Sequence, residues 1–445
     1  MRTRRISVRY FNFSAGSYSN AKKTLRRSDP GRVSSNGGKE IRKYVRAIVA
    51  NVSKRGDKAL IEYEAKFDGV KLRPKDLRVT RTEVEEAYGH VSEEQISSIK
   101  FSKKRIERVE SHLLKRLEGF VIDDGDFEGT KVELRVTPLK SVGCYVPGGR
   151  AAYPSSLIMS VTPALVAGVE RIVVCSPPSK SKMIDPLVLV AGDICGVKEF
   201  YKVGGAQAIG ALAYGTKTIP AVEKIVGPGS KFVTQAKIAV SESVPIDLPA
   251  GPTELLVLAD ETADPELIVA DMISQSEHGE DSISGLMTTS KVVAKTVLDL
   301  IPKRVENIER SSIVRRSLAK NGFVVYCSSM DRCVKLANDF APEHLEIISR
   351  DAAKLAERIT ASGIVLLGPN TPAAASDYTL GTNHVLPTGG FATKYSNLSS
   401  FDFVRRFYVA ECSKEGLRRL AQPTKIIARQ EGLVNHYLAI ERRLR

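Results

Sequence analysis

The chain has 445 residues, 42% of them hydrophobic, and a formal net charge of +15. At roughly 150 residues per domain this length predicts two to four compact units, and the composition is that of soluble globular proteins, which excludes disorder on a large scale. No apolar run approaches the roughly 18 uninterrupted residues that a membrane helix needs; the longest candidate, residues 156–169, contains Pro163. We therefore expect no membrane partner.

The six cysteines are scattered through the chain without a C-x-x-C pair: Cys144, Cys175, Cys195, Cys327, Cys333 and Cys412. In a chain of this size such scattering favours reduced, mostly buried thiols and a cytoplasmic location. The first 28 residues contain no acid, as in organelle transit peptides, and this is the weaker alternative. Basic residues crowd both ends but alternate with acids elsewhere, as on solvated helix faces. Without a nucleic-acid-binding motif, we expect no nucleic-acid partner.

The segment from about Lys39 to Glu118 has a helical pattern. Apolar residues recur at three- and four-residue spacing between Ile41 and Val52, a second helix opens at Gly56, and a third spans about 92–117. After residue 137 the pattern changes to short β-branched runs, each followed by a Gly/Pro loop and a helix. The runs are 141–146, 171–175, 199–203, 224–226, 254–259, 322–327 and 363–367. This alternation predicts two Rossmann-like α/β units with parallel sheets, divided near Pro245.

The last 55 residues contain an aromatic stretch and two short helical patterns. We interpret them as an appended arm rather than a third sheet. Three glycine-rich loops in the first α/β unit suit a phosphate at a helix N-terminus: 145–149 (YVPGG), 203–210 (VGGAQAIG) and 226–230 (VGPGS). Each alone is as compatible with a tight turn, but three together favour a nucleotide.

A polar pair stands at the end of a well-marked helix. Asp264 can cap this helix, Pro265 suits its first turn and Gly279 suits a left-handed position beyond its end. Gln275 and His278 lie three residues apart, so their side chains leave one face. An amide oxygen and an imidazole can bind zinc, although a capped helix with polar residues at its end is the simpler reading.

Three further acid–histidine pairs follow: Glu343–His344, Asp377–His384 and Glu431–His436. Glu343 and His344 would supply two proton acceptors of different basicity at one place. Because adjacent side chains diverge on a regular element, a shared site needs a loop or a helix start, which Pro342 favours. These residue types together are those of a zinc site with open positions.

The chain resembles the histidinol dehydrogenase family, which carries out the last two oxidations of histidine biosynthesis. The resemblance begins at Arg55 and rests on the segments 55–68, 274–279 (SQSEHG), 341–346 (APEHLE) and 377–389. It implies one zinc ion per subunit held by Gln275, His278, Asp377 and His436, with His436 supplied by the partner of an arm-swapped homodimer. The remaining substrate-pocket positions are Thr253, His384 and Glu431, beside His344 and the zinc ligands.

The resemblance also implies NAD as cofactor, with contacts at Tyr145, Gln207 and Ser230; the family usually has Asn where this chain has Ser230. It implies that one Rossmann-like domain is discontinuous. The expected division is an N-terminal arm, a zinc and catalytic domain, an inserted NAD-contacting domain and a C-terminal dimerisation arm: 1–38, 39–140 with 247–388, 141–246, and 389–445.

The implied reaction converts L-histidinol to L-histidine through bound L-histidinaldehyde. His344 would accept the hydroxyl proton, and Glu343 would activate water for the second oxidation. Three alternatives remain open. One is a thiohemiacetal on Cys144, as in aldehyde dehydrogenases. The second is a basic RNA-binding scaffold without bound zinc, and the third is a related enzyme acting on another amino alcohol.

Overall fold

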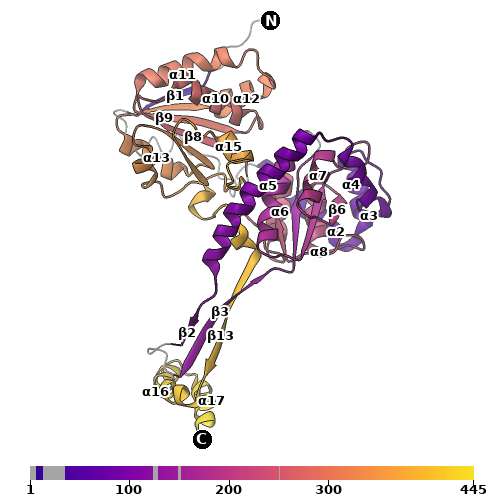
Figure 1. The fold of residues 1–445 in the computed structure, drawn as a ribbon, viewed down its shortest axis with the longest axis vertical. Coiled ribbons are helices and arrows are strands. Elements are labelled where there is room, and N and C mark those ends of the chain that lie inside the picture. Colours follow the sequence, from indigo (N-terminus) through magenta and orange to yellow (C-terminus); the bar gives the residue numbers. More distant parts are fainter. Residues whose placement is uncertain (1–6, 14–35, 124–128, 149–151, 250) are drawn as a thin grey trace.

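The computed structural model describes residues 7–13, 36–123, 129–148, 152–249 and 251–445. These residues form two parallel sheets, each flanked by helices, and a small antiparallel sheet that leads to the C-terminal helices (Figure 1). Within the described ranges, no helix is long and apolar enough to cross a membrane. The α/β class expected from the sequence is confirmed. Most of the expected N-terminal arm, residues 1–38, lies outside the described residues.

The four-stranded sheet has the order β6-β5-β4-β7 with parallel neighbours. Its strands are β4 (Ser141–Tyr145), β5 (Arg171–Ser176), β6 (Glu199–Lys202) and β7 (Lys224–Val226). Val142, Val174 and Val226 are fully buried, as expected for a parallel sheet covered on both faces. All four strands lie where the apolar runs predict them.

The six-stranded sheet has the order β1-β10-β9-β8-β11-β12, also with parallel neighbours. Its strands are β1 (Arg9–Phe13), β8 (Glu254–Ala259), β9 (Ile283–Thr288), β10 (Phe323–Cys327), β11 (His344–Ile348) and β12 (Ile364–Leu367). The sequence predicted β8, β10 and β12. Strand β1 lies within the expected arm but pairs with β10, so it extends the edge of this sheet.

The helices of the first half cover the four-stranded sheet. They are α2 (Asn36–Arg55), α3 (Asp57–Phe67), α4 (Arg81–Tyr88), α5 (Glu93–Leu114), α6 (Pro154–Val166), α7 (Pro186–Ile194), α8 (Gly205–Tyr214) and α9 (Lys231–Val240). Val45 and Leu60 share one core with Tyr145 and Val173, while Ile106 shares another with Val142. This packing differs from the expected division, which grouped residues 39–140 with the other sheet, because an apolar stripe does not specify its partner.

The helices of the second half cover the six-stranded sheet. They are α10 (Pro265–Ser276), α11 (Lys291–Arg304), α12 (Ser311–Asn321), α13 (Met330–Phe340), α14 (Ala352–Ala356) and α15 (Ala373–Tyr378). Leu255 and Val257 of β8 face the core under α10 to α12, whereas Leu256 and Leu258 face the core under α13. Successive side chains of the central strand thus alternate between two cores. Short 3₁₀ turns occur at Pro74–Asp76, Lys115–Leu117, Phe391–Thr393 and Ser400–Phe403.

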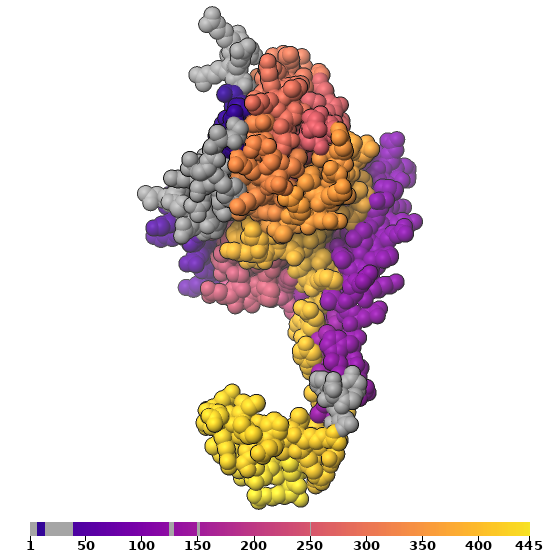
Figure 2. Space-filling model, turned by 90° about the vertical axis from the view of Figure 1, so that its left-hand side faces the viewer, coloured from indigo at the N-terminus to yellow at the C-terminus, as the bar shows by residue number. Residues whose placement is uncertain are grey.

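The C-terminal arm is a β ribbon that ends in two helices. Strand β13 (Val404–Cys412) pairs antiparallel with β3 (Thr130–Pro138), and β2 (Val121–Ile122) completes the small sheet. Helices α16 (Lys414–Gln430) and α17 (Val434–Leu444) stand away from the body (Figures 1 and 2). The two helices are as expected, but the sequence reading excluded a third sheet and was wrong there. Apart from the partly buried Val404 and Val409, all residues of β13 are exposed, so no alternation of buried and exposed residues marks the strand.

Candidate active site

The candidate catalytic residues meet at the amino ends of two adjacent strands. Thr253 precedes β8, Glu343 precedes β11, and His344 is the first residue of β11. These two strands pair in parallel, with His344 opposite Leu255. The expected loop or helix start after Pro342 is therefore a strand start, and Glu343 shares the site because it lies just outside the regular strand.

Glu343 is buried and held by two donors. Its Oε2 accepts hydrogen bonds of 2.7 Å from Thr253 Oγ1 and 2.7 Å from the backbone N–H of Glu254. Gln275 Nε2 donates in turn to Thr253 Oγ1. A single chain of hydrogen bonds thus connects the carboxylate of Glu343 to the amide of Gln275 on α10.

His344 is 1% exposed and lies between two carboxylates. Its Nδ1 is 3.2 Å from the carbonyl oxygen of Glu254 and 3.6 Å from Glu343 Oε2, and its Nε2 is 3.3 Å from Asp377 Oδ1. Burial alone would lower the pKa of His344, but the charge of Glu343 and the hydrogen bond with Asp377 raise the pKa well above its usual value. The cluster can therefore hold a proton on His344.

Asp377 lies close to three histidines, His278, His344 and His384. Its Oδ2 lies 4.0 Å from His278 Nε2, and its backbone carbonyl is 2.7 Å from Nδ1 of His384. Burial alone would raise the pKa of Asp377, but the hydrogen bond with His344 and the nearby imidazoles lower the pKa below its usual value. Burial lowers the pKa of His384. Asp377 is thus a carboxylate ready to bind a cation.

Local sequence explains how α10 presents its two polar residues. Asp264 accepts a hydrogen bond of 2.9 Å from Glu266 N–H and Pro265 occupies the first turn, as predicted. Gln275 is buried near the end of the helix, and His278 is exposed just beyond it. The predicted left-handed conformation of Gly279 is wrong, because its φ is not positive; Glu277 closes the helix in the right-handed region instead.

Two expected site residues lie elsewhere in the chain's own fold. Glu431 and His436 are exposed at the end of the arm, which Figure 1 shows far from β8 and β11. Across the described ranges, no group of three or more His, Cys, Asp or Glu side chains is close enough to hold a metal ion. Within the single chain His278 therefore lies 4.0 Å from Asp377 and Gln275 contacts Thr253, but His436 joins neither.

The glycine-rich loops meet at the carboxyl edge of the four-stranded sheet. The strand order reverses between β4 and β7, which is where open α/β sheets bind ligands. A Cβ atom on Gly227, whose φ is +115°, would lie 2.2 Å from the carbonyl oxygen of Tyr145, so only glycine fits. The side chains of Tyr145 and Gln207 are buried, and Ser230 is exposed at the start of α9 without a capping hydrogen bond. Gly149 lies outside the described residues.

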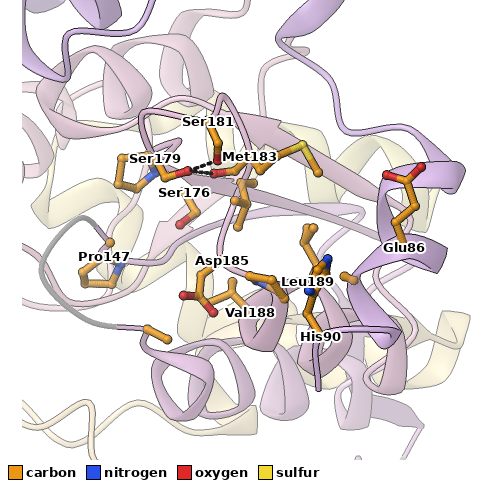
Figure 3. A pocket seen from close by; sticks show the side chains of 16 residues that line it. Glu86, His90, Pro147, Ser176, Ser179, Ser181, Met183, Asp185, Val188 and Leu189 are labelled. Carbon is orange, nitrogen blue, oxygen red and sulfur yellow. Dashed lines mark hydrogen bonds between the residues drawn. The ribbon is translucent and has the colours of Figure 1, made fainter. Parts of the chain in front are cut away.

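A cavity of about 560 Å³ lies beside the first of these loops, the one that follows β4 (Figure 3). Pro147 and Gly148 border it after β4, and Ser176 and Pro177 border it at the end of β5. Asp185 also lines the cavity. In Figure 3, Glu86 and His90 lie on the side of the cavity opposite Pro147. The cavity is large enough for part of a nucleotide.

The thiol of Cys144 is unsuited to nucleophilic catalysis. Its side chain is fully buried in β4, and its Sγ donates a hydrogen bond of 3.7 Å to the carbonyl oxygen of Ser160. Burial raises the pKa of the Cys144 thiol far above its usual range. The alternative of a thiohemiacetal on Cys144 is therefore contradicted. Among the six thiols, Cys412 is exposed and the other five are buried, as expected.

Sequence reasoning missed two buried carboxyl groups beside the cluster. Glu254 accepts a hydrogen bond of 3.1 Å from Gly389 N–H, and Glu346 accepts one of 2.6 Å from Ala373 N–H. Each thereby anchors a loop or helix near Asp377. The signal was present, since both acids stand within otherwise apolar strand sequences.

A two-sheet α/β fold with a buried carboxylate–histidine cluster on one sheet and glycine-rich loops on the other defines a dehydrogenase-like oxidoreductase. The histidinol dehydrogenase family model matches residues 32–444. Similar curated proteins include histidinol dehydrogenases from Methanothermobacter thermautotrophicus, 43% identical over 89% of this chain and 92% of that protein, and from Clostridium acetobutylicum, 43% identical over 91% and 93%. A histidinol dehydrogenase crystal structure from Elizabethkingia anophelis is 33% identical, covers 100% of this chain and 99% of its own, and has a TM-score of 0.92. This chain belongs to the histidinol dehydrogenase family and is an oxidoreductase of histidine biosynthesis.

Proposed function

We propose that the protein oxidises L-histidinol to L-histidine in two NAD-dependent steps through bound L-histidinaldehyde. The observation that carries this proposal is the position of His344 between Glu343 and Asp377, at 3.6 and 3.3 Å. One buried imidazole with a separate carboxylate beside it can serve both oxidations, because each oxidation requires removal of a proton.

In its neutral form His344 would accept the hydroxyl proton while the carbinol carbon loses a hydride, and the carboxylates of Glu343 and Asp377 would stabilise the imidazolium that forms. Glu343 would then remove a proton from water as it adds to the aldehyde. After its first proton has passed to solvent, His344 would accept a hydroxyl proton of the aldehyde hydrate in the second oxidation. The hydrogen bonds from Thr253 and Glu254 N–H support this role, because they fix one oxygen of Glu343. Bound NAD would accept both hydrides.

The donor set of the site suits zinc. Gln275, His278 and Asp377 offer an amide oxygen, an imidazole and a carboxylate, and the 4.0 Å between His278 Nε2 and Asp377 Oδ2 leaves both facing one space. His436 would complete the set from a partner subunit, with one ion in each site. Zinc would orient the imidazole and amine of the substrate as a template. Thr253, His384 and Glu431 would line the substrate pocket.

The arm supports a homodimer. Its helices carry exposed apolar side chains that a monomer leaves in water: Leu420, Ile426, Ile427, Leu433 and Val434. Such a surface is typical of a protein–protein interface. Glu431 ends α16 and His436 lies on α17, and these helices stand away from the body (Figure 2), so a partner's cluster is the place where these residues would act.

NAD would bind where the loops after β4, β6 and β7 meet. The close approach of Gly227 to Tyr145 and the cavity beside Gly148 support this position. Tyr145, Gln207 and Ser230 border these loops; Tyr145 and Gln207 are buried, so in this arrangement the backbone of the loops is the first surface that the cofactor meets.

The deciding experiment measures NADH formed by the purified protein with L-histidinol, before and after treatment with a chelator. We expect about two NADH per histidinol, loss of activity on chelation, and recovery with zinc. Bound zinc without NADH would move the proposal to another amino alcohol. Salt-sensitive RNA binding without zinc or NADH would contradict it altogether.

A further inference from the structure

We propose that Glu64 is a positioning residue for the cofactor, which holds the turn between β6 and α8 and the amide of Gln207 in the arrangement that receives NAD. This inference rests on the proposed function, because it takes NAD as the cofactor. Glu64 lies on α3, is fully buried, and belongs to none of the catalytic, metal or substrate positions described above.

One carboxylate oxygen of Glu64 holds two parts of the cofactor turn. Its Oε1 accepts a hydrogen bond of 3.0 Å from the backbone N–H of Gly204 and one of 2.9 Å from Gln207 Nε2. At the end of β4, the hydroxyl of Tyr145 accepts a hydrogen bond of 3.1 Å from Gly205 N–H. Gly205 has a φ of +61°, so the turn depends on a conformation that few residues adopt. Glu64 and Tyr145 thus fix adjacent peptide groups of one tight turn.

The contact also determines which way the Gln207 amide faces. A carboxylate oxygen requires a donor, so the nitrogen of the amide must point to Glu64. The amide oxygen, Oε1, is then turned away, and it has no hydrogen-bond partner among the described residues. An acceptor that is buried and unpaired is a natural target for a donor group of the cofactor. Without Glu64 the amide could rotate and lose this orientation.

Glu64 also interacts with Asp68, the residue that closes α3. Burial raises the pKa of Glu64 to about 8 and also raises the pKa of Asp68, so Glu64 holds a proton near neutral pH. Protonated Glu64 still accepts through Oε1, and its Oε2 has no hydrogen-bond partner among the described residues. The other titratable groups facing it are Tyr145 on β4 and Cys175 on β5, and burial raises the pKa of both above this range. The pair therefore titrates while its surroundings stay neutral.

The first test is calorimetric titration of NAD, without histidinol, into the full-length protein and its Glu64→Leu variant at pH 6.5. Loss of the two hydrogen bonds should weaken NAD binding about tenfold or more, whereas kcat at saturating NAD should stay within about twofold. Asp57→Leu is the matched control. Asp57 is a buried acid on the same helix, but it binds Thr218, whose hydroxyl donates a 2.6 Å hydrogen bond to it outside the cofactor turn.

The second test uses Glu64→Gln, which reproduces the acceptor and donor of the protonated acid. Wild-type affinity for NAD should fall as the pH rises from 7 to 9, because two ionised carboxylates cannot stay together in a buried site. The Gln variant should bind NAD like the wild type at pH 6.5 and lose this pH dependence. If Glu64→Leu does not fold, the Gln variant alone tests the positioning role of Glu64. Wild-type affinity in Glu64→Leu, or an unchanged pH dependence in Glu64→Gln, would overturn this inference alone. Absence of NAD binding by the wild type would overturn the proposed function and this inference together.

Discussion

Thr253 Oγ1 lies 2.7 Å from Glu343 Oε2 and thereby ties the amino end of β8 to that of β11. The same hydroxyl accepts a hydrogen bond from Gln275 Nε2, so it is donor and acceptor at once. Valine has nearly the same shape as threonine but can neither donate nor accept a hydrogen bond through its side chain. The hydroxyl therefore links the residue proposed to activate water with a residue proposed to bind zinc.

We expect Thr253→Val to lower kcat/KM for histidinol about tenfold or more, since one hydrogen bond to a charged group contributes roughly 1.5–3 kcal/mol. Thr253→Ser should keep most of the activity. Thr262→Val, at an exposed threonine hydrogen-bonded to Asp260, is the control. Steady-state kinetics with purified variants check this expectation, and equal kcat/KM values for the valine variant and the wild type would contradict it.

Glu343→Gln should separate the two oxidations. The amide keeps an oxygen that can accept from Thr253 and Glu254 N–H, but it cannot remove a proton from water. In a single turnover with excess NAD we expect about one NADH per histidinol for the variant, against about two for the wild type. Quenched-flow measurement of NADH and aldehyde checks this result. Two NADH from the variant would remove Glu343 from the water step.

Mixed dimers test whether the arm is exchanged. His278→Ala and His436→Ala should each abolish activity alone. If His436 acts in the partner's site, a mixed dimer of the two variants contains one intact site, and random reassociation should restore about one quarter of wild-type activity. Unfolding and refolding the mixture, followed by activity assay, checks this value. No recovery in a mixture that reforms dimers would show that both histidines act within one subunit.

Ser230→Asn should strengthen NAD binding. Ser230 is exposed at the start of α9 and caps no backbone N–H, so its replacement disrupts no contact within the helix. Asparagine is an equally good residue at this position and reaches further toward the loop after β7. We expect a several-fold decrease in the dissociation constant of NAD, measured by calorimetry. Ser241→Asn, at the other end of α9, should leave it unchanged.

Stability should decrease as the pH rises through the neutral range. Burial raises the pKa of Glu346 to about 8 in the folded protein, against about 4.5 when it is solvated. Between these values the folded state holds a proton that the unfolded state has released, so the contribution of this group is full below pH 4.5 and is lost by about pH 8. Glu346→Gln should make the unfolding free energy depend less on pH over this window. Urea unfolding at several pH values checks the slope; an equal slope would contradict it.

The sequence predicted strands where apolar residues run together. The strands of the four-stranded sheet, and β8, β10 and β12, are of this kind. Strand β11 was missed because it begins with His344, directly after Glu343, and contains Glu346, and β9 was missed because Ser284 and Gly285 interrupt its apolar run. In both strands polar side chains make tertiary hydrogen bonds, Ser284 with Ser276 and Glu346 with the backbone N–H of Ala373, which a local pattern does not record.

The sequence predicted which residue types form the candidate site better than it predicted where in the fold these residues lie. The sequence singled out Glu343, His344 and Asp377, which do lie together. Their place at the amino ends of strands was not predicted, because it depends on which strands neighbour each other. Likewise the helices of residues 39–118 were recognised, but their apolar faces fit either sheet equally well until the packing is known.

The β ribbon of the arm joins parts of the chain that are made at very different times. Thr130 of β3 pairs with Cys412 of β13, so most of the protein is synthesised between the two strands. Until β13 leaves the ribosome, the edge of β3 that it covers has no partner, and on the other edge β2 pairs with only Glu133 and Val132. An open strand edge invites pairing with another chain. Expression should therefore depend on chaperones that shield nascent edges, and a chain broken off before residue 404 should aggregate rather than accumulate as a soluble body.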